Sequence, residues 1–439
     1  MSHVPDRRSL RRTIDGLAIF HDVLDDPVGR AAKTLMVEPA QAPAARLLSA
    51  LAEEAELYPE APVGDAWQNH LLDRVLASDN IYSRKAERAG PSEIGDRLLN
   101  QVRRELGLLQ YLYWEGGAVV AAEAFAALGD DTRPSWTDHR PLGGGPALHT
   151  PEAISFKRDL GASTNWPSYL ERLALTYAAT GVGDFGRFRA FRWIHESEKG
   201  HLEGIDHPDP IRLEDLFTYE REQEPAVRNA ERFAAGLPAN NVLIYGESGT
   251  GKSSTVKALL NAFGDRGLRL IDVPKEALFD LFQILALVRD RKQRFLLFVD
   301  DLSFEENETW YKPLKALLEG SIEARPENVV VYATSNRRHV VRERFSDREE
   351  AFSTDVHELD TMDEKLSLSD RFGLRVWFGG PDQDRYLKIV SALADSRQIS
   401  LPGDQLKERA LMWAERHNAR SGRTARQFID ALTGELALP

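Results

Sequence analysis

Apolar positions follow two different patterns along the 439-residue chain. Up to about residue 205 they recur at three- and four-residue spacing, which predicts amphipathic helices. The clearest of these stretches lie at residues 44–57, 65–76, 91–106 and 166–180. A more apolar stretch at 107–128 predicts a buried helix or helix pair. The first half of the chain is therefore expected to be mainly helical.

Beyond residue 206 short apolar runs alternate with helical patterns. The runs predict five strands, at residues 242–245, 268–273, 294–301, 328–334 and 374–378. This alternation predicts an α/β fold with a parallel sheet sandwiched by helices. After residue 381 only helices are predicted, at 383–396, 404–417 and 423–436. With the Asp-His-Pro-Asp-Pro run at 206–210 as a boundary, three domains are expected: 1–205, 206–380 and a small helical lid at 381–439.

A glycine-rich loop stands between the first of these strands and the next helix. It reads Gly246-x-x-x-x-Gly251-Lys252-Ser253, the complete phosphate-loop pattern in its strand–loop–helix setting. Glycines let the backbone wrap a phosphate closely, and the following helix adds the positive end of its dipole. The predicted phosphate-binding residues are Gly246, Glu247, Ser248, Gly249, Thr250, Gly251, Lys252, Ser253 and Ser254. The loop predicts that a nucleoside triphosphate binds here.

Polar residues at the ends of later strands extend the predicted site. Asp300 and Asp301 end an almost wholly apolar strand, and Asn336 follows the next strand. In phosphate-loop proteins such an acid holds Mg²⁺ together with the loop serine, so Ser253 and Asp300 are the predicted metal ligands. Asp301 is expected to orient or activate a water, and Asn336 to hold that water near the γ-phosphate.

Two arginines complete the predicted catalytic set. Arg371 lies in Leu-Ser-Asp-Arg-Phe-Gly, and Arg426 lies in Gly-Arg-Thr-Ala-Arg-Gln. A guanidinium near a transferring phosphoryl group is worth about 10³–10⁵ in rate.

Composition limits the compartment and the binding partners that are expected for this protein. The chain has no cysteine, which excludes disulfides and favours the cytoplasm, and no apolar run is long enough to span a membrane. The basic first twelve residues lack the apolar region of a signal peptide. The net charge of −13 argues against a surface that coats nucleic acid.

Three other patterns are assigned no chemistry. The Gly-x-Gly-x-x-Gly at 181–186 precedes a strand, the reverse of a dinucleotide site, and predicts a turn. A charged insertion at 320–365, with a basic cluster near residues 337–344, predicts a solvated helix and loop or a partner-contacting loop. A last group fits no metal-ligand spacing and predicts a solvated linker: His195, Glu196, His201, Glu203, Asp206 and His207.

The motif series resembles the AAA+ ATPases, in the order characteristic of that family. Within it the chain is most similar to the bacterial family known as domain of unknown function 815. The phrases that carry this resemblance include A-N-N-V-L-I-Y-G-E-S-G-T-G-K-S-S (239–254), V-D-D-L-S-F-E-E (299–306), L-S-D-R-F-G-L (368–374) and S-G-R-T-A-R-Q-F (421–428).

The resemblance implies ATP as ligand, a C-terminal lid, homo-oligomers, Arg371 reaching into a neighbour's site and Arg426 touching the γ-phosphate from the lid. It also implies that residues 213–219 close on adenine. Most AAA+ proteins carry glutamate where this chain has Asp301, so slow turnover is expected.

The leading hypothesis is an ATPase that uses Mg²⁺-ATP to remodel or regulate a macromolecule, with the N-terminal half selecting an unknown protein partner. Alternatives are a nucleotide-gated binding module with little turnover, or a DNA-associated loader, which the acidic charge disfavours. A small-molecule kinase fits the lid and paired arginines less well. Lack of an L-S-G-G-Q stretch excludes an ABC-type ATPase, and lack of an N-K-x-D run favours ATP over GTP.

Overall fold

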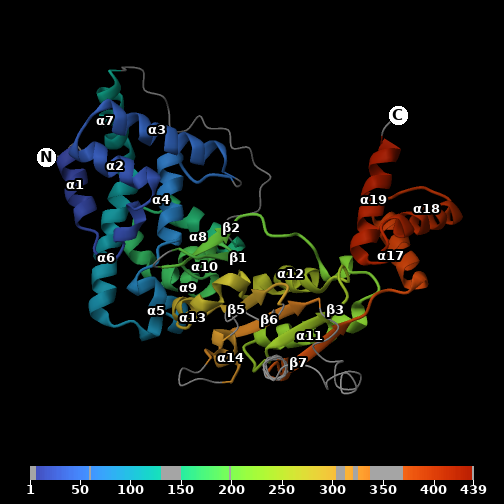
Figure 1. Ribbon diagram of the computed structural model, residues 1–439. Helices are drawn as coiled ribbons and strands as arrows, with labels where there is room; N and C mark the ends of the chain where they lie inside the picture. Colours follow the sequence, from blue (N-terminus) through green and yellow to red (C-terminus); the bar gives the residue numbers. More distant parts are fainter. Residues whose placement is uncertain are drawn as a thin grey trace. The chain divides into compact units, whose positions relative to one another are not determined.

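The computed structural model describes residues 6–58, 61–129, 150–196, 199–302, 312–319, 325–336 and 369–437 (Figure 1). The chain forms two compact units, Met1–Arg187 and Phe188–Pro439. Each unit buries a hydrophobic core of its own.

The first unit is helical, as its sequence pattern predicts. Its described α-helices are α1 (Arg7–Asp15), α2 (Pro27–Val37), α3 (Gln41–Glu56), α4 (Ala66–Leu76), α5 (Ile81–Ala89), α6 (Asp96–Tyr111), α7 (Gly117–Leu128), α8 (Pro151–Ala162), α9 (Leu170–Thr180) and α10 (Gly183–Arg187). Short polar side chains start several of them. Asp65 and Asn80 cap α4 and α5, each within a capping box that satisfies free backbone amides of the first turn.

Large aromatic side chains fill the core of this unit, and two of its buried tyrosines form hydrogen bonds through their hydroxyls. The Tyr82 hydroxyl donates to the Leu170 carbonyl (2.6 Å), and the Tyr177 hydroxyl donates to the Val75 carbonyl (2.5 Å). Because these bonds replace the hydrogen bonds to water that the two hydroxyls lose on burial, the rings can be buried at little cost.

The second unit contains a seven-stranded sheet in the order β2-β1-β4-β5-β6-β3-β7. The strands are β1 (Ala190–Ile194), β2 (His201–Ile205), β3 (Val242–Gly246), β4 (Leu268–Asp272), β5 (Arg294–Val299), β6 (Val329–Ser335) and β7 (Leu374–Phe378). All neighbouring strands are parallel except β1 and β2, which are antiparallel. The carboxyl ends of β3, β4, β5 and β6 therefore meet at one edge, where parallel sheets bind their ligands.

Helices surround this sheet. They are α11 (Glu220–Ala234), α12 (Lys252–Phe263), α13 (Leu281–Val288) and α14 (Lys312–Glu319). Leu296 and Phe298 of β5 belong to the core that α11 and α12 share, whereas the alternating Phe295, Leu297 and Val299 are buried on the opposite face. Burial on both faces explains why β5 is a continuous apolar run.

The C-terminal helices α17 (Gln383–Ser396), α18 (Gly403–Arg416) and α19 (Gly422–Ala437) pack against one another (Figure 1). Their bounds lie within a residue of those expected from the sequence. Asp382 caps α17 by accepting a hydrogen bond from the Arg385 amide (2.8 Å).

The start of the second unit differs from the expected boundary at 205/206. The linker interpretation is wrong for residues 201–205, which form β2 and pair with β1 along its length. β2 is an edge strand whose residues are exposed or half-buried, so no apolar run marks it in the sequence. Residues 183–187 form α10, a helical turn in the first unit, where the sequence predicts a turn.

Candidate functional site

The glycine-rich loop joins β3 to α12 and depends on backbone conformations that favour glycine. The φ angles of Gly246, Gly249 and Gly251 are 143°, 75° and 94°. A Cβ atom on Gly246 would lie 2.0 Å from the Phe378 carbonyl oxygen, so no larger residue fits beside β7. These glycines leave the amino end of α12 open to an anion.

Lys252 begins α12 and lies across the loop. Its buried ammonium donates to the carbonyls of Gly246 (3.0 Å) and Glu247 (2.7 Å). Burial lowers the pKa of Lys252 to about 8, although the charges of Asp301 and Asp300 oppose the shift. The ammonium thus lies within the loop, where phosphate oxygens could replace the two carbonyls as acceptors.

The other predicted loop residues have separate positions. The Thr250 hydroxyl donates to the Glu247 carbonyl (2.8 Å), and the Glu247 amide donates to the Phe378 carbonyl (3.2 Å). Ser248 is exposed at the loop, and Ser254 is half-buried in the first turn of α12. The loop is therefore bonded both to itself and to β7.

The structure brings Ser253 and Asp300 into direct contact. The Ser253 hydroxyl donates to Asp300 Oδ1 at 2.6 Å, although 47 residues separate the two in the chain. The same carboxylate oxygen accepts from the Thr334 hydroxyl (2.5 Å) and the Asp301 amide (3.1 Å). A serine hydroxyl beside a carboxylate supplies hard oxygen ligands of the kind that Mg²⁺ prefers.

Asp301 and Asn336 are also joined. The Asn336 side-chain amide donates to Asp301 Oδ1 at 2.7 Å. Asp301 has a φ of 51°, a left-handed conformation that aspartate tolerates better than most residues, and its amide donates to the Thr334 hydroxyl (2.9 Å). Both acids are solvent-accessible at the sheet edge.

Thr334 is a further residue of the candidate site, and the sequence did not predict it. Its side chain is almost fully buried, and its hydroxyl lies between Asp300 and the Asp301 backbone. The signal available was its place in Thr-Ser-Asn at the end of a strand, two residues before Asn336.

Asp272, at the end of β4, is a second missed acid near the site. Burial raises the pKa of its carboxyl; the Arg192 charge lowers it and the Asp300 charge adds to the rise.

The two predicted arginines do not join this bonded group. Arg371 lies just before β7 and forms an ion pair with Glu319 of α14. Arg426 is exposed on α19. The arginine that the structure brings to the loop is Arg423, one helical turn earlier, whose amide donates to the Gly249 carbonyl (3.2 Å). Its charge also contributes to lowering the Lys252 pKa.

Two other histidines lie beside carboxylates and are candidates for metal binding: His195 and His70. His195 Nδ1 lies 2.7 Å from Asp280 Oδ2, which also accepts from the Trp193 indole (2.9 Å). His195, which the sequence assigned to a solvated linker, is therefore hydrogen-bonded to Asp280 in the second unit.

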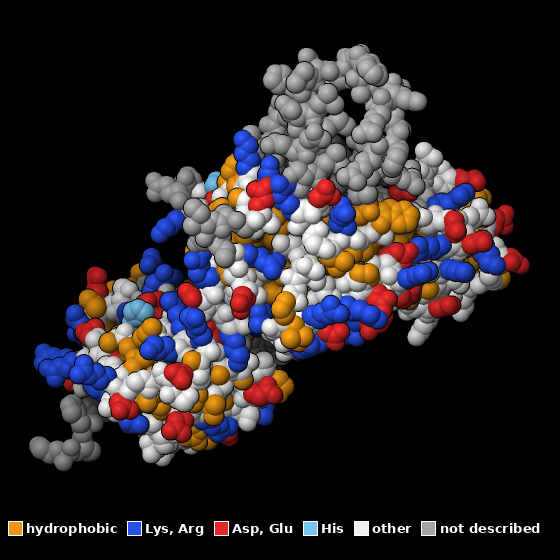
Figure 2. Space-filling model, turned by 90° about the horizontal axis from the view of Figure 1, so that it is seen from below, with side chains coloured by type: hydrophobic (Ala, Val, Ile, Leu, Met, Phe, Trp, Pro, Cys, Tyr) orange, Lys and Arg blue, Asp and Glu red, His pale blue; other side chains and the backbone are white. Residues whose placement is uncertain are grey.

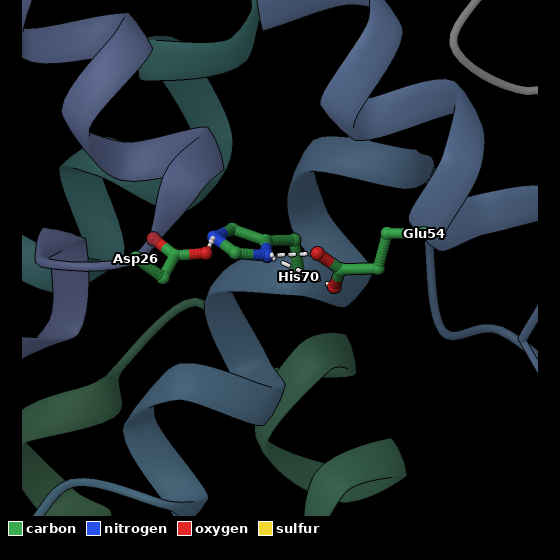
Figure 3. A group of neighbouring side chains, drawn as sticks. All are labelled: Asp26, Glu54 and His70. Atoms are coloured by element: carbon green, nitrogen blue, oxygen red, sulfur yellow. Dashed lines mark hydrogen bonds and ion pairs between the residues drawn. The ribbon is translucent and has the colours of Figure 1, made fainter.

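In the helical unit, buried His70 lies between Asp26 and Glu54 (Figure 3). Its Nδ1 is 2.8 Å from Glu54 Oε2, and its Nε2 is 3.3 Å from Asp26 Oδ2. One ligand atom from each residue lies within 4.8 Å of the others, but each ring nitrogen already faces a carboxylate. Burial alone would lower the His70 pKa, but hydrogen bonds to the two carboxylates and their charges raise it to about 9. This group is a charged link between α2, α3 and α4, and a protonated His70 has no lone pair to offer a metal ion.

The parallel sheet, the glycine loop with its lysine and acid pair, and the helical lid define the class of this protein, a P-loop fold of the AAA+ type. The chain belongs to the family described as Protein of unknown function (DUF815), whose model matches residues 186–436. The match begins close to Phe188, the first residue of the second compact unit.

Among solved structures, the chain is similar to the Thermotoga maritima RuvB Holliday junction branch migration motor, with 14% identity, 51% of this chain and 72% of that chain covered, and a TM-score of 0.31. A substituted form of the same protein matches with 13% identity, the same coverage of both chains and a TM-score of 0.32. No curated protein matches the chain. In the described part of the chain, no helix is long and apolar enough to cross a membrane.

Proposed function

We propose that this protein binds Mg²⁺-ATP and hydrolyses it to ADP and phosphate. The observation that carries the proposal is the 2.6 Å hydrogen bond between Ser253 and Asp300. It joins the amino end of the loop helix to the acid that ends β5, the pair of groups that phosphate-loop enzymes use to hold Mg²⁺. A glycine-rich turn with no ligand would not require this contact.

Each residue then has a defined role. The loop amides and Lys252 bind the phosphates, and Ser253 and Asp300 hold the metal. Mg²⁺, when bound, neutralises the charge of the β- and γ-phosphates. Asp301 orients a water and accepts its proton as the water oxygen bonds to the γ-phosphorus and ADP leaves with the bond electrons. Asn336 holds the Asp301 carboxylate in position, through the 2.7 Å hydrogen bond.

The arginines enter this proposal through the lid and through a second copy of the chain. Arg423, bonded at its backbone to Gly249, and Arg426 on the same helix face would approach the γ-phosphate when the lid closes. Arg371 would serve a neighbouring subunit's site, which makes the active form a homo-oligomer. The proposed output is remodelling of a macromolecular partner that the N-terminal helical unit selects.

Two substitutions test the enzyme proposal. Lys252→Ala should abolish ATP binding, and Asp301→Asn should preserve binding while stopping phosphate release. Matched controls are Lys257→Ala, an exposed lysine on the same helix, and Asp265→Asn, an exposed aspartate bonded to Arg189. Normal phosphate release by the Asp301→Asn protein would refute the role given to Asp301.

A nucleotide-gated binding module with little turnover is the second candidate. The observation in its favour is that the Asp301 carboxylate is already hydrogen-bonded to Asn336. The Asp301 side chain is also one methylene shorter than the usual glutamate, so it reaches less far toward a water. Asp301→Glu should then raise the rate of phosphate release. ATP-dependent binding of a partner without any phosphate release would favour the module over the enzyme.

A DNA-associated loader has less support. Acidic and basic side chains are interspersed on the face shown in Figure 2, and the net charge is −13. The arginine and histidine cluster that suggested DNA, Arg337, Arg338 and His339, lies outside the described residues. Binding to DNA that weakens linearly with the logarithm of salt concentration would revive this reading.

A further inference from the structure

The strand register brings charged side chains from β1 and β4 to the face of the sheet that holds the candidate metal ligands. Arg192 of β1 lies opposite Asp272 of β4, and Asp272 lies opposite Phe298 of β5. Side chains paired in this way point to the same face of a parallel sheet. Because Phe298 belongs to the core shared with α12, Arg192 and Asp272 lie on the α12 side, from which Ser253 donates to Asp300.

Asp272 is the neighbour of Asp300 on the adjacent strand. Asp300 follows Phe298 by two positions, so it is offset from Asp272 by one row of side chains on the same face. In a regular sheet, α-carbons that are one strand and one row apart lie about 8 Å from each other. This separation leaves room for a hydrated metal ion between the two carboxylates.

The Asp272 carboxylate is short of hydrogen-bond donors. Its Oδ2 lies 3.6 Å from Arg192 Nε, and apart from this long contact no described residue donates to it, although its side chain is only 35% exposed. Burial raises the pKa of Asp272; the Arg192 charge opposes the rise, and the negative charge of Asp300 adds to it. A cation between the two acids, or a water bound to that cation, would relieve both the repulsion and the lack of donors.

The chemistry of Mg²⁺ suits such a position. The ion gives up its waters reluctantly and usually keeps several of them when it binds to a protein. Carboxylates that do not touch a metal ion can accept hydrogen bonds from groups that do, and in this way they orient the inner ligands and raise the affinity for the metal.

We propose that Asp272 is a positioning residue for the Mg²⁺ that Ser253 and Asp300 hold, and that its carboxylate accepts a hydrogen bond from a water on that ion. The inference rests on the proposed function and deepens it, because it assigns part of the metal affinity to β4. The role requires the charge of Asp272 and does not require its ion pair with Arg192.

Calorimetric titration of the full chain with a non-hydrolysable ATP analogue, at a series of Mg²⁺ concentrations, measures this role independently of turnover. Asp272→Asn should raise the Mg²⁺ concentration that gives half of the metal-dependent tightening by about tenfold, the lower end of the usual effect of losing an outer-shell partner, because this acid is partly exposed. With a chelator in place of Mg²⁺, the variant should bind the analogue no more weakly than the wild type, because a negative charge near the triphosphate has been removed.

Three further variants separate a metal role from a structural one. Asp272→Glu keeps a carboxylate and should recover most of the lost metal affinity. Arg192→Ala breaks the ion pair but leaves the acid in place, so its Mg²⁺ requirement should not rise. The control is Asp265→Asn, which breaks the 2.6 Å ion pair between Asp265 and Arg189, two residues that lie just before β4 and β1 at the opposite end of these strands. Its Mg²⁺ requirement should equal that of the wild type.

The results distinguish a failure of the inference from a failure of the proposed function. Wild-type protein that does not bind the analogue, or binds it without any dependence on Mg²⁺, would refute the proposed function. Wild-type binding that tightens with Mg²⁺, together with an unchanged Mg²⁺ requirement in Asp272→Asn, would overturn only the role of Asp272. An equal rise in the Mg²⁺ requirement of Arg192→Ala would also overturn it, because the ion pair would then account for the effect.

Discussion

Replacing Thr334 by valine removes one hydroxyl from the site and keeps the shape of the side chain. That hydroxyl donates to Asp300 Oδ1 (2.5 Å) and accepts from the Asp301 amide (2.9 Å). The Asp301 amide keeps a second acceptor, Asp300 Oδ1 at 3.1 Å, so the net loss is one hydrogen bond to a charged group. Such a bond is worth about 1.5–3 kcal/mol. Because Asp300 is solvent-accessible, the lower part of this range applies, about 2 kcal/mol.

At 1.36 kcal/mol for each tenfold change in rate, this loss predicts a fall of about 30-fold in kcat for Mg²⁺-dependent ATP hydrolysis. ATP affinity measured in the presence of a chelator should not change, because Thr334 contacts the acids and not the phosphate loop. Phosphate release at saturating ATP measures the first quantity, and calorimetric titration measures the second.

The matched control is Thr176→Val, which removes a buried hydroxyl bonded to a backbone carbonyl one turn earlier in α9. It should alter the free energy of unfolding slightly and leave hydrolysis unchanged. A folded Thr334→Val protein that hydrolyses ATP within twofold of the wild-type rate would refute the reasoning, since the acid pair would then not depend on β6.

Three further results are expected. ATP affinity should fall about tenfold between pH 7 and pH 9. The reason is that the Lys252 pKa of about 8 leaves roughly a tenth of the protein with a charged lysine at pH 9. Titrations that give equal affinities at both pH values would contradict this prediction. The His70 link has a folded-state pKa of about 9, above the unfolded value of about 6.5, so its stabilisation, about 3 kcal/mol, is present below pH 6.5 and lost as pH rises through 9. Urea unfolding should show this loss in the wild type and not in His70→Gln, whereas the same loss in His70→Gln would assign it to another group. Gly249→Ala should weaken ATP binding, because a Cβ atom there would lie 2.7 Å from Ser421 Oγ at a φ of 75°. The control is Gly434→Ala, at a helical position with open space, which should raise the free energy of unfolding by about 1 kcal/mol and leave ATP binding unchanged. Equal effects of the two substitutions on ATP binding would show that the loop tolerates a side chain.

Much of the candidate site could be predicted because its parts are contiguous in the chain. The phosphate loop lies within eight residues, and its glycines indicate the positive φ angles that the loop adopts. The pair Asp300 and Asp301 directly follows a run of apolar residues that marks a strand buried on both faces. The lid helices were also placed well, since caps such as Asp382 act through neighbouring backbone amides.

Other parts were not predictable because they depend on residues far apart in the chain. Thr334 meets Asp300 only because β6 lies next to β5 in register, 34 residues away. The Arg423 amide reaches the Gly249 carbonyl because of how α19 packs, which the sequence motif does not show. β2 carries no apolar run, since it is stabilised by backbone pairing with β1 and buries little.

The sequence by itself determined the phosphate loop, the acid pair, the alternation of strands and helices, and the helical character of the first half, because each depends on local backbone preference or on the period of apolar residues. Only the tertiary structure decided which polar groups meet at the sheet edge and that the lid is tied to Thr218 by Arg385. It also decided that His70 is enclosed by two carboxylates. These contacts join residues about 16 to 167 positions apart in the chain. A hydrogen bond forms only when packing brings its two atoms within a few ångströms, and a local sequence pattern does not contain that information.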